Sequence, residues 1–597
     1  MRTFLATRIL FLRELLKRHW RKALQWREHI ALTDEAINLL LAGVVGLLGG
    51  LVNLAFYLCV ESVQSFALHR KGDLVEIASV FTWWQRLITP ALGGLAAGLV
   101  LHWGFRLVST SRSAGFLEVV VAGDGKMGLR SALIKALSSL LSISTGASIG
   151  REGLITQLTA TLGSKLGQIP KWPPHRLRLL VACGAAAGLS AAYNVPISGA
   201  VFAAQIVLGN FSMSLFAPLI VSSVVAAVTS RTFFGIEPWY QVPVLDFTNP
   251  WQLPWFVLLG ILAGVLGAAF MKMIHWSEQA FARLKLPIFV RLSLAGFIVG
   301  AIAITYPDVW GNGYAATTRI LMKPETIQFL LGLFVAKLVA TLVTVGSGTV
   351  GGVFTPTLFV GAALGAVLGT ALHGAGWAMT LPVPVFALVG MGSVLAATTH
   401  SPLLALILIF EISLNYSLMP PLMLGCAVAT LVARRFHPVS VYAATLSDPH
   451  LLDRREDARS GTTMSHTVGD LMQEPVPPLS EVTTVPQIAE RFLTSTYNHL
   501  PVVNEKGRLI GIVALQDLKE FLNTGNELQG VIAADVMRPP PPDLLPSQTV
   551  LEVLPILLAS DLMRLPVVNN ASERRLVGAL IRSDALAQVS QAIASTR

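Results

Sequence analysis

Long apolar stretches with few charges follow one another from about residue 36 to residue 436, for example at residues 37–58, 256–271 and 329–345. About 20 consecutive apolar residues are enough to cross the hydrocarbon core of a bilayer as a helix. Only 13% of the 597 residues are charged, whereas a soluble domain carries roughly 25%. Because backbone polar groups in lipid must pair internally, the sequence predicts an all-α polytopic membrane protein over residues 34–446.

Basic residues gather at the N-terminus, where residues 2–27 alternate Arg and Lys with Leu, Phe and Trp. This pattern is typical of an interfacial helix. The positive-inside rule then places residues 1–33 on the cytosolic side. Arg434 and Arg435 flank a span in the same way. The net charge of +10 is therefore explained by membrane topology and does not indicate nucleic-acid binding.

The membrane region contains an internal repeat. Residues 135–167 align without gaps to residues 337–369, so that Gly150 meets Gly352. Residues 188–206 align to residues 394–412 in the same order along the chain. Duplicated halves with helices interrupted by Gly and Pro are typical of transporters and channels built from inverted repeats. We therefore expect two inverted halves of broken and tilted helices, with a boundary near residues 235–250.

Each half carries a Gly-rich stretch before a further apolar helix: STGASIGREG at 144–153 and GSGTVGGVFTP at 346–356. Glycine allows sharp turns and close approach of the backbone to an ion. Helix N-termini present free N–H groups with partial positive charge. Two such ends that converge would form an anion site without a buried cation.

These stretches resemble motifs of the CLC family of chloride channels and proton/chloride exchangers. GREGL at 150–154 is similar to the family's GREGP, with Leu154 in place of proline. GGVFTP at 351–356 is similar to the GGxFxP element in the second half of the family's sequences. GAAAGLSAAYNVPISG at 184–199 and SVYAATL at 440–446 match two further blocks, and VWGNGY at 309–314 is closest to the bacterial ClcB-like branch. The resemblance implies the CLC fold, a homodimer, and a multi-pass protein of the bacterial inner membrane whose N-terminus and tail are cytoplasmic.

The resemblance also implies roles for individual residues. Glu152 corresponds to the gating glutamate, which competes with chloride until chloride or a proton displaces it. An acid inside a membrane is costly and is therefore a functional candidate on its own account. The predicted chloride-binding positions are Tyr442, the backbone amides of Val353, Phe354, Gly150, Arg151 and Gly153, and Ser113, which is one residue from the aligned Ala114.

The sequence departs from exchangers of the well-studied kind at the internal proton path. Their second glutamate receives protons from the cytoplasm, but the aligned positions here are Gln205 and Ile206, and neither ionises. This favours channel-like conduction of chloride. Proton/chloride exchange is the alternative, and transport of another anion a further one. For Glu411, the repeat partner of Gln205, we expect a structural role.

Residues from about 448 have the composition of a soluble protein and carry a second repeat. The segment LPVV occurs at 500–503 and again at 565–568, and each copy begins a pattern of strand, turn, strand and helix. This arrangement resembles a CBS pair with an α/β fold. We expect a linker at 447–465 and CBS modules at 466–525 and 531–592, a tail that the ClcB-like branch lacks. Asp517 and Asp584 match half of the adenine-nucleotide motif, but Ala514 and Ile581 replace its hydroxyl residues. A structural role is therefore favoured, and no cofactor is required.

The sequence predicts neither an enzyme nor a metal site. Cys59, Cys183 and Cys426 lie in separate apolar segments without ligand spacing. The Gly-Ser-Gly turn at 346–348 has no matching His and Asp.

Overall fold

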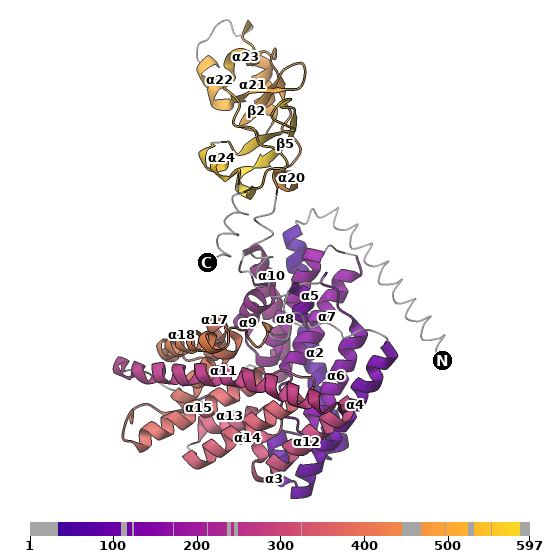
Figure 1. Cartoon of the computed structure of the whole chain (residues 1–597), viewed down its shortest axis with the longest axis vertical. Coiled ribbons are helices and arrows are strands. Elements are labelled where there is room, and N and C mark those ends of the chain that lie inside the picture. Colours follow the sequence, from indigo (N-terminus) through magenta and orange to yellow (C-terminus); the bar gives the residue numbers. More distant parts are fainter. Residues whose placement is uncertain are drawn as a thin grey trace. The chain divides into compact units, whose positions relative to one another are not determined.

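The computed structural model divides the chain into two compact units, Met1–Ser447 and Asp448–Arg597. The first is entirely helical where it is described, and the second carries the strands (Figure 1). The structure describes residues 34–443 and 467–585, apart from short gaps at 109–115, 122–123, 171, 173, 210, 212, 236–239, 241, 244–246, 248, 324, 496, 523–529, 551 and 561.

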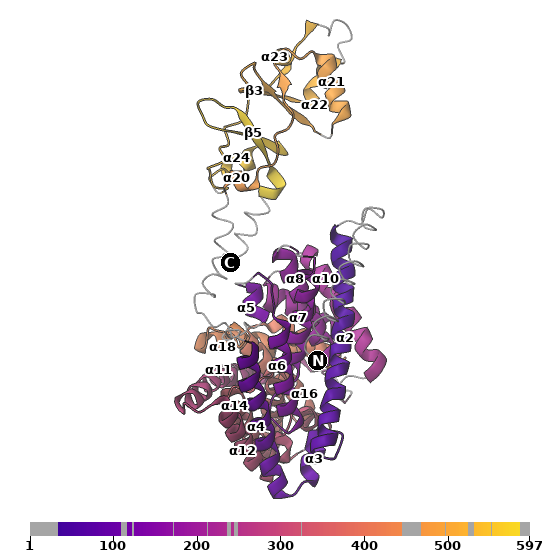
Figure 2. The same ribbon diagram turned by 90° about the vertical axis from the view of Figure 1, so that its right-hand side faces the viewer.

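The first half of the membrane unit runs from α2 to α10. Its elements are α2 (Asp34–Ala67), α3 (Leu74–Val80), α4 (Trp83–Val108), α5 (Phe116–Val121), α6 (Leu129–Ser144), α7 (Glu152–Gln168), α8 (Pro174–Tyr193), α9 (Pro196–Phe202), the π-helical turn η1 (Ala203–Leu208) and α10 (Met213–Phe234). Figure 2 shows α2 as a long helix at the side of this unit.

The second half runs from η2 to α18. Its elements are η2 (Pro250–Gln252), α11 (Leu253–Arg283), α12 (Ile288–Thr305), η3 (Pro307–Val309), α13 (Tyr314–Met322), α14 (Ile327–Gly346), α15 (Phe354–Gly374), α16 (Val383–Thr399), α17 (Pro402–Ser413), η4 (Tyr416–Leu418) and α18 (Met419–Phe436). Within the described residues, eight helices are long and apolar enough to cross a membrane.

The two halves pack in the same way. Helix α7 packs on α8 as α15 packs on α16, and α2 packs on α8 and α10 as α11 packs on α16 and α18. A Cβ added at Gly49 would lie 2.7 Å from Ala187 Cβ, and one at Gly267 would lie 2.6 Å from Ala397 Cβ. A close crossing of the corresponding helices thus occurs in each half, although the two contacted alanines are four residues apart in the repeat alignment.

The turns that break the helices are repeated as well. Gly146 and its repeat partner Gly348 both have positive φ, at 104° and 91°, which glycine adopts without steric cost. Asn194 and its partner His400 also have positive φ, at 62° and 55°. Each is followed two residues later by a proline that opens a short helix, α9 or α17, as the fixed φ of proline favours.

The tail folds as two similar α/β modules. Its elements are α20 (Val468–Leu471), β1 (Leu479–Ser480), α21 (Val485–Thr494), β2 (His499–Val503), β3 (Leu509–Ala514), α22 (Leu515–Leu522), α23 (Ala533–Val536), α24 (Leu554–Ala559), β4 (Arg564–Val568) and β5 (Leu576–Ile581). Strand β1 pairs parallel to β2, β2 antiparallel to β3, and β4 antiparallel to β5.

The modules exchange their lead-in segments. Gln473, in the lead-in segment at the start of the first module, pairs with Ala579 of β5, and Arg538, in the lead-in segment of the second, pairs with Ile512 of β3. The buried cluster of the first module also includes Ala579. Each sheet is therefore completed by the other module's chain, and the two modules form one unit.

Candidate functional site

Helices α7 and α15 begin next to each other where the two halves meet. Gly150 N donates to Gly352 O and Gly352 N donates to Gly150 O, both at 2.8 Å. Such reciprocal, antiparallel pairing of repeat-equivalent residues places a local two-fold axis between them. Neither N-cap residue, Arg151 nor Val353, caps its helix with its side chain. First-turn N–H groups of both helices are therefore free of side-chain caps from these residues, and such groups can bind an anion.

Glu152 opens α7 and sends its carboxylate to the opposite half. The side chain is buried, with the residue 3% exposed. Its Oε1 accepts a hydrogen bond from Thr355 N at 3.0 Å, and its Oε2 accepts one from Thr355 Oγ1 at 2.9 Å. Both donors belong to the first turn of α15, where the helix dipole favours negative charge.

The carboxylate lies over the two paired glycines. A Cβ added at Gly150 would be 2.0 Å from Glu152 Oε1, and one at Gly352 would be 2.7 Å from the same atom. Gly153 lies against Gly352 on the other side, since its added Cβ would be 2.9 Å from Gly352 Cα. Glycine at these positions leaves the space that Glu152 fills. The carboxylate and a free anion would therefore use the same N–H groups.

Hydroxyl and aromatic groups that sequence reasoning did not single out surround this carboxylate. Tyr193 Oη lies 2.6 Å from Thr355 Oγ1, and the Tyr193 ring lies against Phe354 at 5.5 Å between centroids. The Arg151 guanidinium lies over the Tyr314 ring at 5.8 Å. Tyr193 and Thr355 both lie within motifs identified in the sequence, but neither residue was assigned a role there.

Tyr442 is held close to the membrane helices. Val441 N donates to Thr398 O at 2.9 Å, and the Tyr442 ring contacts Phe202 edge-on at 5.5 Å. Ser113 and the adjacent Ala114 lie outside the described residues.

Gln205 in η1, which continues α9, and Glu411 in α17 link these short helical segments to each other. The Ser401 hydroxyl, at the start of α17, donates to Gln205 Oε1. Glu411, near the end of α17, accepts from Ile197 N at 2.8 Å and Ser198 N at 2.7 Å, and from Ser198 Oγ. Glu411 thus caps the N-terminus of α9, while Ile206 is buried.

Comparison with known proteins decides the family. The model of the voltage gated chloride channel family matches residues 93–434, and CBS domain models match residues 468–524 and 533–590. The chain belongs to the voltage-gated chloride channel (CLC) family. It is 44% identical over 415 residues to a putative ClcB-like chloride channel protein of Ralstonia nicotianae, which covers 68% of this chain and 96% of the relative. The ClcB channel of Salmonella typhimurium is 36% identical, and the match covers 68% of this chain and 98% of the relative.

Solved CLC structures share the fold. A slow cyanobacterial Cl−/H+ antiporter is 26% identical, with a TM-score of 0.61 and coverage of 70% of this chain and 99% of that one. A eukaryotic CLC transporter is 20% identical, with a TM-score of 0.56, and covers 92% of this chain and 97% of its own. The predicted fold class, a multi-pass helical membrane protein of the CLC type with a CBS pair, is confirmed.

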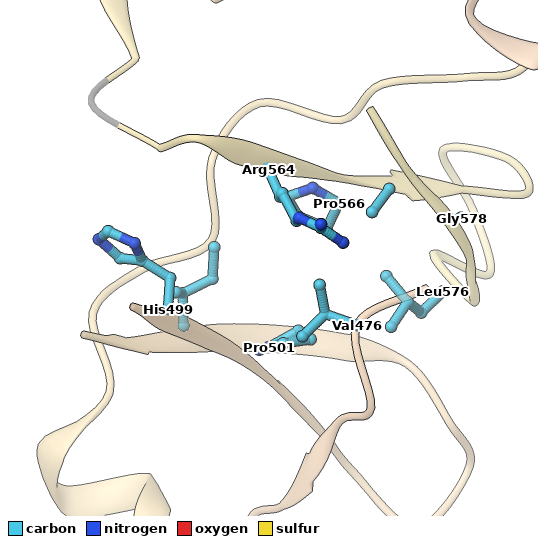
Figure 3. Close-up of a pocket in the computed structure, with 9 residues that line it drawn as sticks. Val476, His499, Pro501, Arg564, Pro566, Leu576 and Gly578 are labelled. Carbon is cyan, nitrogen blue, oxygen red and sulfur yellow. The ribbon is translucent and has the colours of Figure 1, made fainter. Parts of the chain in front are cut away.

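The CBS pair of this CLC chain has a narrow central cleft. His499 and Pro501 of β2 face Arg564 and Pro566 of β4 across it (Figure 3). Its volume is about 20 Å³, which is near that of one or two waters and far below that of small-molecule pockets.

The two aspartates of the predicted nucleotide motif differ in their surroundings. Asp517 is paired with Arg538 and also accepts from Ala514 N at 3.3 Å. Asp584 is exposed and accepts from the adjacent Ser583 hydroxyl. A larger cavity of about 320 Å³ adjoins Ala514 and Arg538. A ribose at Asp517 would have to replace the Arg538 pair, so nucleotide binding stays a prediction.

Proposed function

We propose that this chain carries chloride across the membrane along a pathway that Glu152 opens and closes. The position of the Glu152 carboxylate carries the proposal, because it occupies the anion-binding position between the N-termini of α7 and α15. A chloride ion that takes this position must displace the carboxylate. Protonation would neutralise the carboxylate and weaken its hold on the same N–H groups.

Both converging helix ends come from one chain, so each subunit of the homodimer that the family resemblance implies has its own pathway. The proposed binding groups are the amides of Gly150, Arg151, Gly153, Val353 and Phe354, the Tyr442 hydroxyl, and Ser113. We place the protein in a bacterial inner membrane, with residues 1–33 and the CBS tail in the cytoplasm. The Arg434–Arg435 pair at the end of α18 supports this orientation.

Channel-like conduction is the favoured mode. Gln205 and Ile206 stand where exchangers of the well-studied kind carry glutamates, and Gln205 is a neutral partner of Ser401. Proton/chloride exchange is the second candidate, since a relative of similar fold is described as a Cl−/H+ antiporter. In exchange, protons would have to pass Gln205 and Ile206 through water.

The deciding measurement is the reversal potential of the full chain in planar bilayers under opposed chloride and pH gradients. For a channel, we expect a potential that follows the chloride gradient alone. A potential that shifts with the proton gradient would establish exchange. If neither gradient sets the potential, a bi-ionic series of anions would show which other anion is carried.

The test of the gate is Glu152→Ala. We expect chloride flux from proteoliposomes to persist and its dependence on pH to disappear, because the only group proposed to titrate in the pathway is gone. Full pH dependence in this variant would show that Glu152 is not the gate.

A further inference from the structure

The Glu152 carboxylate ends a short chain of hydroxyl groups. Thr355 Oγ1 lies 2.9 Å from Glu152 Oε2, and Tyr193 Oη lies 2.6 Å from Thr355 Oγ1. Thr355 is fully buried and Tyr193 is 2% exposed. The three side chains come from the starts of α7 and α15 and the end of α8. The chain therefore joins both repeats at the point where they meet.

The direction of both hydrogen bonds follows from chemistry. An ionised carboxylate only accepts, so the single Thr355 hydroxyl proton is donated to Glu152. Thr355 Oγ1 can then only accept from Tyr193, which must be the donor. All donors in the chain thus point toward the negative charge, and such aligned hydrogen bonds strengthen one another in a buried site.

We propose that the Thr355 and Tyr193 hydroxyls form a latch that holds the Glu152 carboxylate in the anion-binding position. The inference rests on the proposed role of Glu152 as the gate. Thr355 contacts the gating group directly. Tyr193 is a positioning residue that acts through Thr355. Opening, by chloride or by a proton, requires the loss or reversal of these hydrogen bonds.

The latch acts in a defined electrostatic setting. Arg151 lies beside Glu152 and carries a positive charge, and its guanidinium lies over the Tyr314 ring. The phenols of Tyr193 and Tyr314 stay neutral at ordinary pH. Changes at Thr355 or Tyr193 therefore remove hydrogen-bond donors without removing a charge. A shift in the pH profile then reports on Glu152 itself.

The experiment measures chloride flux of the full chain in proteoliposomes against pH and against chloride concentration. Thr355→Val keeps the shape of the side chain but loses the hydroxyl. A hydrogen bond to a charged group changes an equilibrium constant by a factor of about 10 to 100. For Thr355→Val we therefore expect half-maximal flux at a pH about one unit higher, and at a chloride concentration about tenfold lower, than in the unmodified protein. Tyr193→Phe should shift both in the same direction by less.

Three further variants separate the latch from general damage. Thr355→Ser restores the hydroxyl and should return the profile to that of the unmodified protein. The double variant Thr355→Val with Tyr193→Phe should match Thr355→Val alone, since Tyr193 acts through Thr355. Thr344→Val removes a buried hydroxyl that bonds only within its own helix, to Ala340 O, and should leave the profile unchanged.

The outcomes distinguish the latch from the gate. If Glu152→Ala abolishes pH dependence while Thr355→Val and Tyr193→Phe behave as the unmodified protein, the latch is refuted and the gate stands. If Glu152→Ala keeps its pH dependence, the gate itself is refuted. In the Glu152→Ala background, Thr355→Val should cause no further change in the profile, and an additional shift there would also overturn the latch.

Discussion

At the scale of single residues, Lys337 is the buried cation that most needs a physical explanation. It is fully buried in α14, and its Nζ donates to Val309 O and Gly311 O, each at 2.8 Å. These carbonyls belong to the segment that carries Trp310, whose ring lies against Gly146. Lys337 thus fixes the packing under the loop that leads to Glu152, although it does not touch the site.

Lys337→Met should destabilise the membrane unit by about 2–4 kcal/mol, because two buried carbonyls lose their hydrogen-bond donor. Thermal unfolding in detergent, followed by tryptophan fluorescence, would measure the loss. Lys126→Met is the matched control, since the Lys126 side chain is 65% exposed and such surface charges contribute little. Equal melting temperatures for the two variants would contradict this account of Lys337.

At the scale of elements, close backbone packing joins equivalent helices of the two halves. Helices α4 and α12 cross so closely that a Cβ added at Gly296 would lie 2.0 Å from Pro90 O. At the same crossing, a Cβ added at Gly94 would lie 2.3 Å from Leu292 O. Both contacts are with backbone, which cannot move aside as a side chain can. These glycines therefore set the distance between the halves.

Gly296→Ala should lower stability by about 1–3 kcal/mol or more, because the added methyl group must force the two backbones apart. The same unfolding assay measures the change. Gly374→Ala serves as the control, since nothing lies within 4 Å of an added Cβ at that helix end. Unchanged stability of Gly296→Ala would mean that the α4–α12 crossing can relax at little cost.

Much of the architecture could be predicted from the sequence, and the contacts between halves could not. The aligned glycines Gly150 and Gly352 revealed the repeat and the converging helix ends, because close approach of the backbone requires glycine at the same position of each half. The bond between Tyr193 and Thr355 joins residues 162 positions apart, and a hydroxyl in an apolar helix usually bonds its own turn. Asp517 illustrates a similar limit, since its motif did not reveal that Arg538 already pairs with it.

At the scale of the whole molecule, the chain combines a complete membrane unit with an added tail. The membrane unit ends at Ser447, and matches over 415 residues already cover 96–98% of ClcB-type relatives. The CBS modules complete one another's sheets, so the tail has its own means of folding.

A chain truncated after Ser447 should therefore keep the chloride flux and the pH profile of the full protein. Flux from proteoliposomes that contain equal amounts of monodisperse protein provides the measurement. Loss of flux from a truncated protein that still melts cooperatively would show that the tail is required for transport and is not an addition to it.

The reciprocal pairing of Gly150 and Gly352 has a consequence for the sidedness of transport. Two inverted halves related by a two-fold axis in the membrane plane present the same backbone to both sides of the membrane. Their backbone alone therefore cannot distinguish inward from outward flow. In the ungapped repeat alignment, the position of Glu152 in one half is taken by Phe354 in the other. Of the two symmetry-equivalent positions, one therefore carries a side chain that can titrate and the other carries a phenylalanine that cannot. This difference at the site should contribute to rectification in this molecule, and acidifying the two sides in turn should have unequal effects.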